Sequence, residues 1–70
     1  MDEKRAAAAD IERGQITAAE DGKYRVESYS RDGLTTPPIP AVGEGVYSVG
    51  DRVYFFLFDD GHGAILAAFD

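Results

Sequence analysis

The sequence predicts an all-β fold: a small barrel of five short strands that follows a short N-terminal helix or flexible tail. Apolar and polar residues alternate with a period of two along residues 14–20 and 23–30, as they do in half-buried strands, and residues 52–58 form a strand-like run that is apolar on both faces. Gly and Asp turn signals separate these segments at short intervals. Many short strands with regular turns are typical of a small sandwich or barrel, and closing the barrel protects edges that so short a sheet leaves open.

Residues 1–13 form the first of two predicted regions, and residues 14–70 form the barrel domain. The stretch DEKRAAAADIER contains strong helix formers, Asp2 is a suitable N-cap, and Gly14 suits a left-handed C-terminal position. Ile11 is its one bulky apolar residue, so the segment has no apolar stripe. Because an isolated helix of this length is marginal in water, a helix and a disordered tail both stay open.

The barrel is predicted to begin with a hairpin. Residues 14–20 (GQITAAE) and 23–30 (KYRVESYS) flank Asp21-Gly22, a dipeptide that favours tight hairpin turns. Tyr24, Val26 and Ser28 fall on one face of the second strand, and Arg25, Glu27 and Tyr29 fall on the other.

The middle of the chain, LTTPPIPAVGEGVYSVG, contains three prolines. Proline cannot donate to a strand ladder, so a central strand is not expected here. A short strand near residues 34–36 is expected to precede a loop that crosses one end of the barrel. Pro37 to Pro40 would make that loop stiff.

The strongest predicted strand covers residues 52–58, RVYFFLF, and is apolar on both faces. Its inner face would carry Val53, Phe55 and Leu57. Its outer aromatic side chains would form an exposed patch larger than soluble monomers normally tolerate. The N-terminal helix, through Ile11 and the alanines, or a partner subunit would cover this patch. The predicted interaction surface consists of these outer aromatic side chains and Tyr29 of the preceding strand: Tyr29, Tyr54, Phe56 and Phe58.

Composition disfavours several classes of function. The net charge of −6 opposes binding to a nucleic-acid backbone, and the seven Lys and Arg residues are scattered along the chain. No apolar run reaches the length of a membrane span, and the four alanines are too few for a signal-peptide core. We therefore expect no membrane association and a cytoplasmic location at synthesis.

Candidate chemistry is sparse. His62 lies beside Asp59 and Asp60, but three potential ligands without helical spacing predict a solvated hairpin loop and no metal site. Asp51 follows Gly50 at a strand start, where an Asp usually accepts hydrogen bonds from nearby backbone amides. We predict no catalytic, cofactor-binding or metal-binding residue, and no enzymatic activity.

Two segments carry a family resemblance. GQITAAEDGKYRV, and after the proline-bearing loop YSVGDRVYFFLFDDGHGAIL, resemble the small OB-type β-barrels of phage tail and baseplate-spike proteins. The resemblance spans residues 14–69, although the closing strand ILAAF lacks the usual Gly. It implies an OB-like barrel that serves as a structural module of a phage or prophage particle. The resemblance thus implies a virion-associated accessory protein.

The functional prediction is a non-enzymatic structural or assembly module whose partners are protein subunits, either further copies of itself, as a homo-oligomer, or other virion proteins. The alternative is an OB-type binding module for single-stranded nucleic acid or an oligosaccharide. Strand aromatics such as Tyr24 and Tyr54 favour the alternative, because bases and sugars stack on them. The scattered Lys and Arg residues disfavour it.

Overall fold

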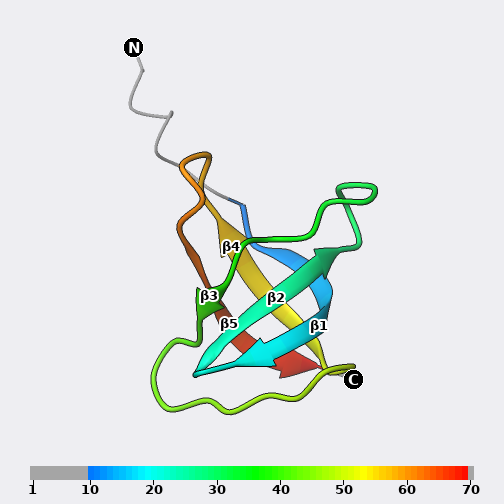
Figure 1. The fold of residues 1–70 in the computed structure, drawn as a ribbon. Coiled ribbons are helices and arrows are strands. Elements are labelled where there is room, and N and C mark those ends of the chain that lie inside the picture. Colours follow the sequence, from blue (N-terminus) through cyan, green and yellow to red (C-terminus); the bar gives the residue numbers. More distant parts are fainter. Residues whose placement is uncertain (1–9, 70) are drawn as a thin grey trace.

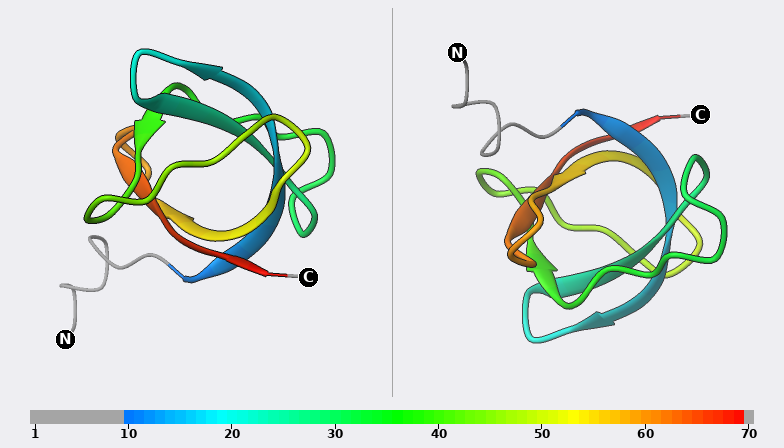
Figure 2. Two further views of the ribbon diagram at one scale, coloured as in Figure 1. Left: turned by 90° about the horizontal axis from the view of Figure 1, so that it is seen from below. Right: turned by 90° about the horizontal axis from the view of Figure 1, so that it is seen from above.

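The computed structural model describes residues 10–69, which form one five-stranded sheet curled into a barrel-like shape (Figures 1 and 2). The strands are β1 (Glu12–Glu20), β2 (Lys23–Ser28), β3 (Ile39–Pro40), β4 (Arg52–Leu57) and β5 (Gly63–Phe69). Their order in the sheet is β3-β2-β1-β4-β5, and every strand pair is antiparallel. The predicted all-β, five-stranded architecture is confirmed. No helix among the described residues is long and apolar enough to cross a membrane.

The β1–β2 hairpin forms at the predicted turn. Asp21 and Gly22 both have positive φ, 55° and 77°, which is the type I′ geometry that matches strand twist. Tyr24 and Val26 are buried, as their spacing predicts. A bulge between Ile16 and Ala18 bends β1 and increases its curl.

The start of the barrel differs from the prediction. The helix or tail predicted for residues 1–13 falls mainly on residues 1–9, which lie outside the described residues. β1 begins at Glu12, two residues before the predicted boundary at Gly14. Gly14 is not a helix cap: it is a buried strand residue, where a Cβ would lie 2.5 Å from the Glu27 carbonyl oxygen and 2.7 Å from Val26. Close approach of β2 therefore explains this glycine.

The proline-bearing segment forms a strand that the sequence did not predict. β3 pairs with β2 at the edge of the sheet, where Pro40 needs no ladder donor. The strand predicted near residues 34–36 is reduced to a single bridge between Thr35 and Glu27. Ala41 then bridges to Ile65 of β5, and the Val42 amide donates to the Ile65 carbonyl at 2.8 Å. This contact joins the two ends of the sheet and closes the barrel on that side.

Residues 42–51 cross one end of the barrel, as predicted for the loop (Figure 2). The Gly50 amide donates to the Ile16 carbonyl at 2.8 Å, which ties the end of the loop to β1. Asp51 has the expected structural role, because its carboxylate accepts a hydrogen bond from the Ser48 amide at 2.9 Å.

The core lies inside the curl and draws on all five strands. Val53 and Phe55 are fully buried and Leu57 packs against them, so the predicted inner face of β4 is confirmed. The other fully buried apolar side chains are Ile16, Val26, Ile39 and Ile65. The ring of Tyr47 packs edge-on against Tyr24 at 5.7 Å, which seals the barrel end beneath the loop.

Candidate interaction surface

Ile11, Arg13, Tyr29 and Tyr54 line one groove of about 390 Å³ on the outside of the barrel, together with Glu12 and Ser30. The strand order brings them together. Arg13 of β1 lies opposite Tyr54 of β4, and its carbonyl accepts a hydrogen bond from the Tyr29 amide at 2.9 Å. We call these four residues the tyrosine groove. Its three apolar side chains are exposed, at 66% for Ile11, 52% for Tyr29 and 38% for Tyr54.

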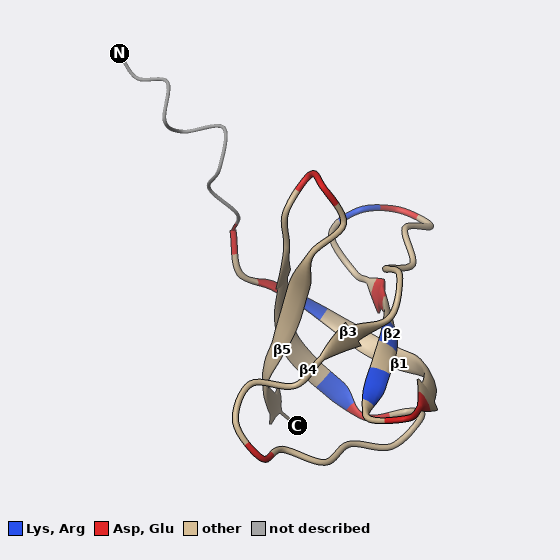
Figure 3. Cartoon of the chain, turned by 60° about the vertical axis from the view of Figure 1, so that its left-hand side comes forward, with Lys and Arg blue, Asp and Glu red and all other residues tan. Residues whose placement is uncertain are grey.

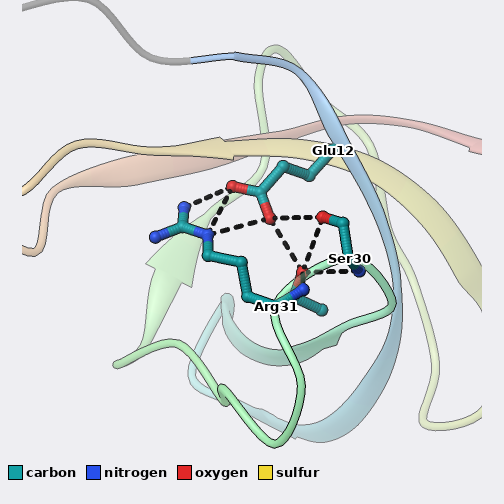
Figure 4. Close-up of polar contacts among 4 residues, drawn as sticks. Glu12, Ser30 and Arg31 are labelled. Atoms are coloured by element: carbon teal, nitrogen blue, oxygen red, sulfur yellow. Dashed lines mark hydrogen bonds and ion pairs between the residues drawn. The ribbon is translucent and has the colours of Figure 1, made fainter.

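A polar network surrounds Glu12, which also lines the groove (Figure 4). The Arg31 guanidinium pairs with the Glu12 carboxylate, and its Nε donates to both carboxylate oxygens at 3.0 and 3.2 Å. The Ser28 hydroxyl donates to the same carboxylate at 2.8 Å and accepts the Arg31 amide at 3.1 Å. The network thus fixes the turn after β2 against the start of β1.

Hydrogen bonding dominates the ionisation of Glu12. Hydrogen bonds from Arg31 are the largest influence and hold the pKa of the Glu12 carboxyl below its ordinary value, although burial opposes them. The Ser28 hydroxyl adds to the lowering. The Glu12 side chain is only 9% exposed, so an ionised carboxylate is kept beneath the groove with its hydrogen bonds satisfied.

The four predicted surface residues divide into two groups. Tyr29 and Tyr54 share the tyrosine groove. Phe56 and Phe58 do not line it: their rings pack edge-on at 5.4 Å, and both are partly buried. The Tyr54 ring also lies against Phe69 of β5 at 4.8 Å. Phe56 and Phe58 therefore cover part of each other's surface, whereas Tyr54 packs on Phe69 and stays open at the groove.

Charges are segregated over the described residues (Figure 3). Four of the five described cations lie on strands: Arg13, Lys23, Arg25 and Arg52. Seven of the ten described acidic residues lie outside strands: Asp10, Asp21, Asp32, Glu44, Asp51, Asp59 and Asp60. Arg52 also lies over the Phe69 ring, at 5.4 Å from its centroid. The strands thus carry most of the described cations, and Arg13 is the one that lines the tyrosine groove.

A second exposed apolar surface was not predicted. Residues 42–49, which we call the valine loop, expose Val42 by 50%, Val46 by 85% and Val49 by 61%. The sequence pattern indicated this surface: the valines lie between glycines and not in a strand, so no strand directs their side chains into the core. Glu44 lies in the same loop and is also exposed.

The β4–β5 turn is solvated, as predicted. The Asp60 carboxylate accepts the His62 amide at 2.9 Å and lies 3.2 Å from the His62 ring, with both side chains well exposed. Hydrogen bonding from the His62 backbone, and then from its ring, lowers the pKa of Asp60. Within residues 10–69, no three His, Cys, Asp or Glu side chains gather in a way that could hold a metal ion.

The structure therefore presents an aromatic and cationic groove on a rigid wall, and a separate apolar loop at one barrel end. No protein-family model matches the chain, and no curated protein is significantly similar to it.

Proposed function

We propose that this protein is a non-enzymatic assembly module that binds another protein subunit through the tyrosine groove. The observation that carries the proposal is the exposure of Ile11, Tyr29 and Tyr54 together, beside Arg13, in one groove. Tyr and Arg are enriched among the residues that supply most of the energy of protein–protein contacts. Tyrosine adds a large apolar area with only two side-chain torsions to fix, and a hydroxyl that stays hydrogen-bonded at the rim.

The groove is also suited to binding because its walls are fixed before a partner arrives. Arg13 and Tyr54 lie on paired strands, and the Glu12–Arg31 network holds the turn that carries Tyr29. Binding of a partner would therefore cost little conformational entropy, because this surface is already ordered. The resemblance of residues 14–69 to phage tail and baseplate modules supports a particle subunit as the partner.

Site-specific photo-crosslinking tests this function. The photoreactive residue p-benzoylphenylalanine would replace Tyr54 in the full-length chain, expressed in the cells that carry its gene. We expect an adduct with a polypeptide that forms only on irradiation. The same residue at Thr35, an exposed position away from the groove, is the control and should give little adduct. Equal adducts from both positions, or none from position 54, would contradict the proposal.

One observation favours a second candidate, a binding module for single-stranded nucleic acid or an oligosaccharide. Arg13 lies between Tyr29 and Tyr54 across the sheet, which places a cation among aromatic rings. Single strands bind to such surfaces by stacking bases on the rings while cations meet the phosphates. The net charge of −6 opposes this function, and we therefore rank it second.

A further inference from the structure

We propose that the tyrosine groove of one copy of this chain accepts the valine loop of a second copy, so that copies associate head to tail. This inference rests on the proposed function and names the partner surface. Three observations support it: the two surfaces are both apolar, they carry opposite charges, and they lie at different places on the same molecule.

The valine loop has the form of a ligand presented on a rigid support. Both ends are anchored by backbone hydrogen bonds, from the Val42 amide to Ile65 and from the Gly50 amide to Ile16. Val46, at 85% exposure, extends furthest into solvent. A single exposed valine needs no explanation, but three in one anchored loop expose apolar area whose burial would be favourable.

The charges of the two surfaces are complementary. The groove contains Arg13 of β1, and Arg52 lies on the outer face of the neighbouring strand β4. The loop contains Glu44. Glu12, the carboxylate nearest the groove, is already paired with Arg31. Docking the loop in the groove would therefore bring a carboxylate towards cations at the edge of an apolar contact, an arrangement that favours correct partners.

The same charges disfavour a symmetric dimer. Two grooves that face each other across a two-fold axis would bring both copies of Arg13 into one contact, where the like charges would repel. A groove that meets a loop has no such conflict. The contact is therefore heterologous, with a different surface on each copy, and such contacts produce rings or filaments.

The positions of the two surfaces require a contact between molecules. The groove lies where β1 begins and β2 ends, whereas the loop crosses the opposite end of the barrel (Figure 1). One chain cannot place its own anchored loop in its own groove. Each copy would instead retain one open groove and one open loop, which lets the association continue from copy to copy.

The test is the mass of the purified full-length chain in solution, measured by light scattering over a concentration series. We expect a mass that rises above the 7.6 kDa of one chain as concentration increases. Val46→Asp and Arg13→Glu should each weaken association by at least about tenfold, because each puts a carboxylate where the contact needs an apolar or cationic group. Val46 is so exposed that its replacement should leave the fold intact.

Charge exchange gives the sharper result. Glu44→Arg alone should also weaken association, and mixing it with Arg13→Glu should restore a contact between the two variants. Asp59→Lys, in the exposed turn before β5, makes the same change in net charge as Glu44→Arg but lies outside both surfaces. It should leave association unchanged, which separates the local contact from the effect of net charge.

Two results would overturn the inference. One is a chain that stays at 7.6 kDa at every concentration. The other is an association that Val46→Asp and Arg13→Glu both leave unchanged. Neither result decides the proposed function: an adduct from position 54 with a different protein would leave that function standing while the head-to-tail contact fails.

Discussion

Glu12 shows how one residue links the fold to the candidate surface. It is a strand residue of β1, its carboxylate lies under the tyrosine groove, and it accepts hydrogen bonds from Ser28, Ser30 and Arg31. Those donors belong to the end of β2 and the turn after it. The carboxylate therefore determines where the backbone of Tyr29 is held, although it is itself almost covered.

Acid should weaken this contact. The folded-state pKa of Glu12 lies below its ordinary value near 4.5, so the unfolded chain takes up the proton first as the pH falls. The stabilisation is complete above about pH 5 and is lost as the pH falls through the lowered pKa. Glu12→Gln should cost about 1 kcal/mol at neutral pH, a discounted value because the Arg31 side chain is 44% exposed.

Urea unfolding from pH 7 down to pH 3 measures the effect of Glu12→Gln. The unfolding free energy of the variant should change less with pH than that of the wild type in the acidic range. Glu27→Gln is the matched control, since Glu27 is an exposed carboxylate on the neighbouring strand. Parallel pH profiles for the wild type and Glu12→Gln would show that the network adds no pH-dependent stability.

At the scale of elements, the segment over residues 34–42 determines whether the sheet closes. Its hydrogen bonds reach β2 through Thr36 and β5 through Val42. Thr36 is fully buried, its hydroxyl accepts the Val26 amide at 3.0 Å, and its own amide donates to the Val26 carbonyl. A side chain thus replaces a ladder partner where the prolines leave the segment without a full strand.

Thr36→Val should destabilise the fold. The substitution keeps the shape of the side chain but leaves the buried Val26 amide without its acceptor, which costs about 1–3 kcal/mol. Thr35→Val is the control, because Thr35 is exposed and adjacent. Denaturant unfolding of both variants should show a loss for Thr36→Val alone. Equal stabilities would mean that water or a backbone shift satisfies the amide.

The sequence predicted four of the five strands because their patterns are local. The alternation in residues 23–28, the apolar run in residues 52–57 and the turn at Asp21-Gly22 need no knowledge of distant residues. β3 was not predicted, because a two-residue strand with a proline exists only where β2 supplies a partner. The Glu12–Arg31 pair was missed for a similar reason: residues 1–13 were interpreted as a helix or tail, which hid the start of β1.

The candidate surface was predicted residue by residue but not as an arrangement. Spacing alone places Tyr29 and Tyr54 on outer faces, and both line the groove. Their proximity follows from the order β2-β1-β4, which a sequence pattern does not contain. Phe56 and Phe58 have the same spacing as Tyr54, yet they pack on each other. Packing between rings, and not strand alternation, decides which aromatic residues stay open.

At the scale of the whole molecule, the total charge and its distribution favour different partners. The chain carries −6, which repels polyanions at long range. Over the described residues, however, the outer wall of β2, β1 and β4 carries four cations, while most acidic residues lie in loops. An acidic protein segment carries few charges, so the acidic loops repel it only weakly as it approaches that wall. A nucleic-acid strand brings one negative charge with every nucleotide, so the acidic loops repel it even while the cations of the wall attract it.

A single-stranded oligonucleotide should therefore bind weakly and only when salt is low. Fluorescence anisotropy of a labelled oligo-dT strand, titrated with the full-length chain, measures this directly. We expect no binding at about 0.15 M salt, where exposed charges are screened beyond about 8 Å. Any binding at low salt should disappear with Arg13→Gln, which removes the cation between the two tyrosines. Tight binding at physiological salt, lost on Tyr54→Ala, would instead make the groove a stacking surface and favour the nucleic-acid function over protein assembly.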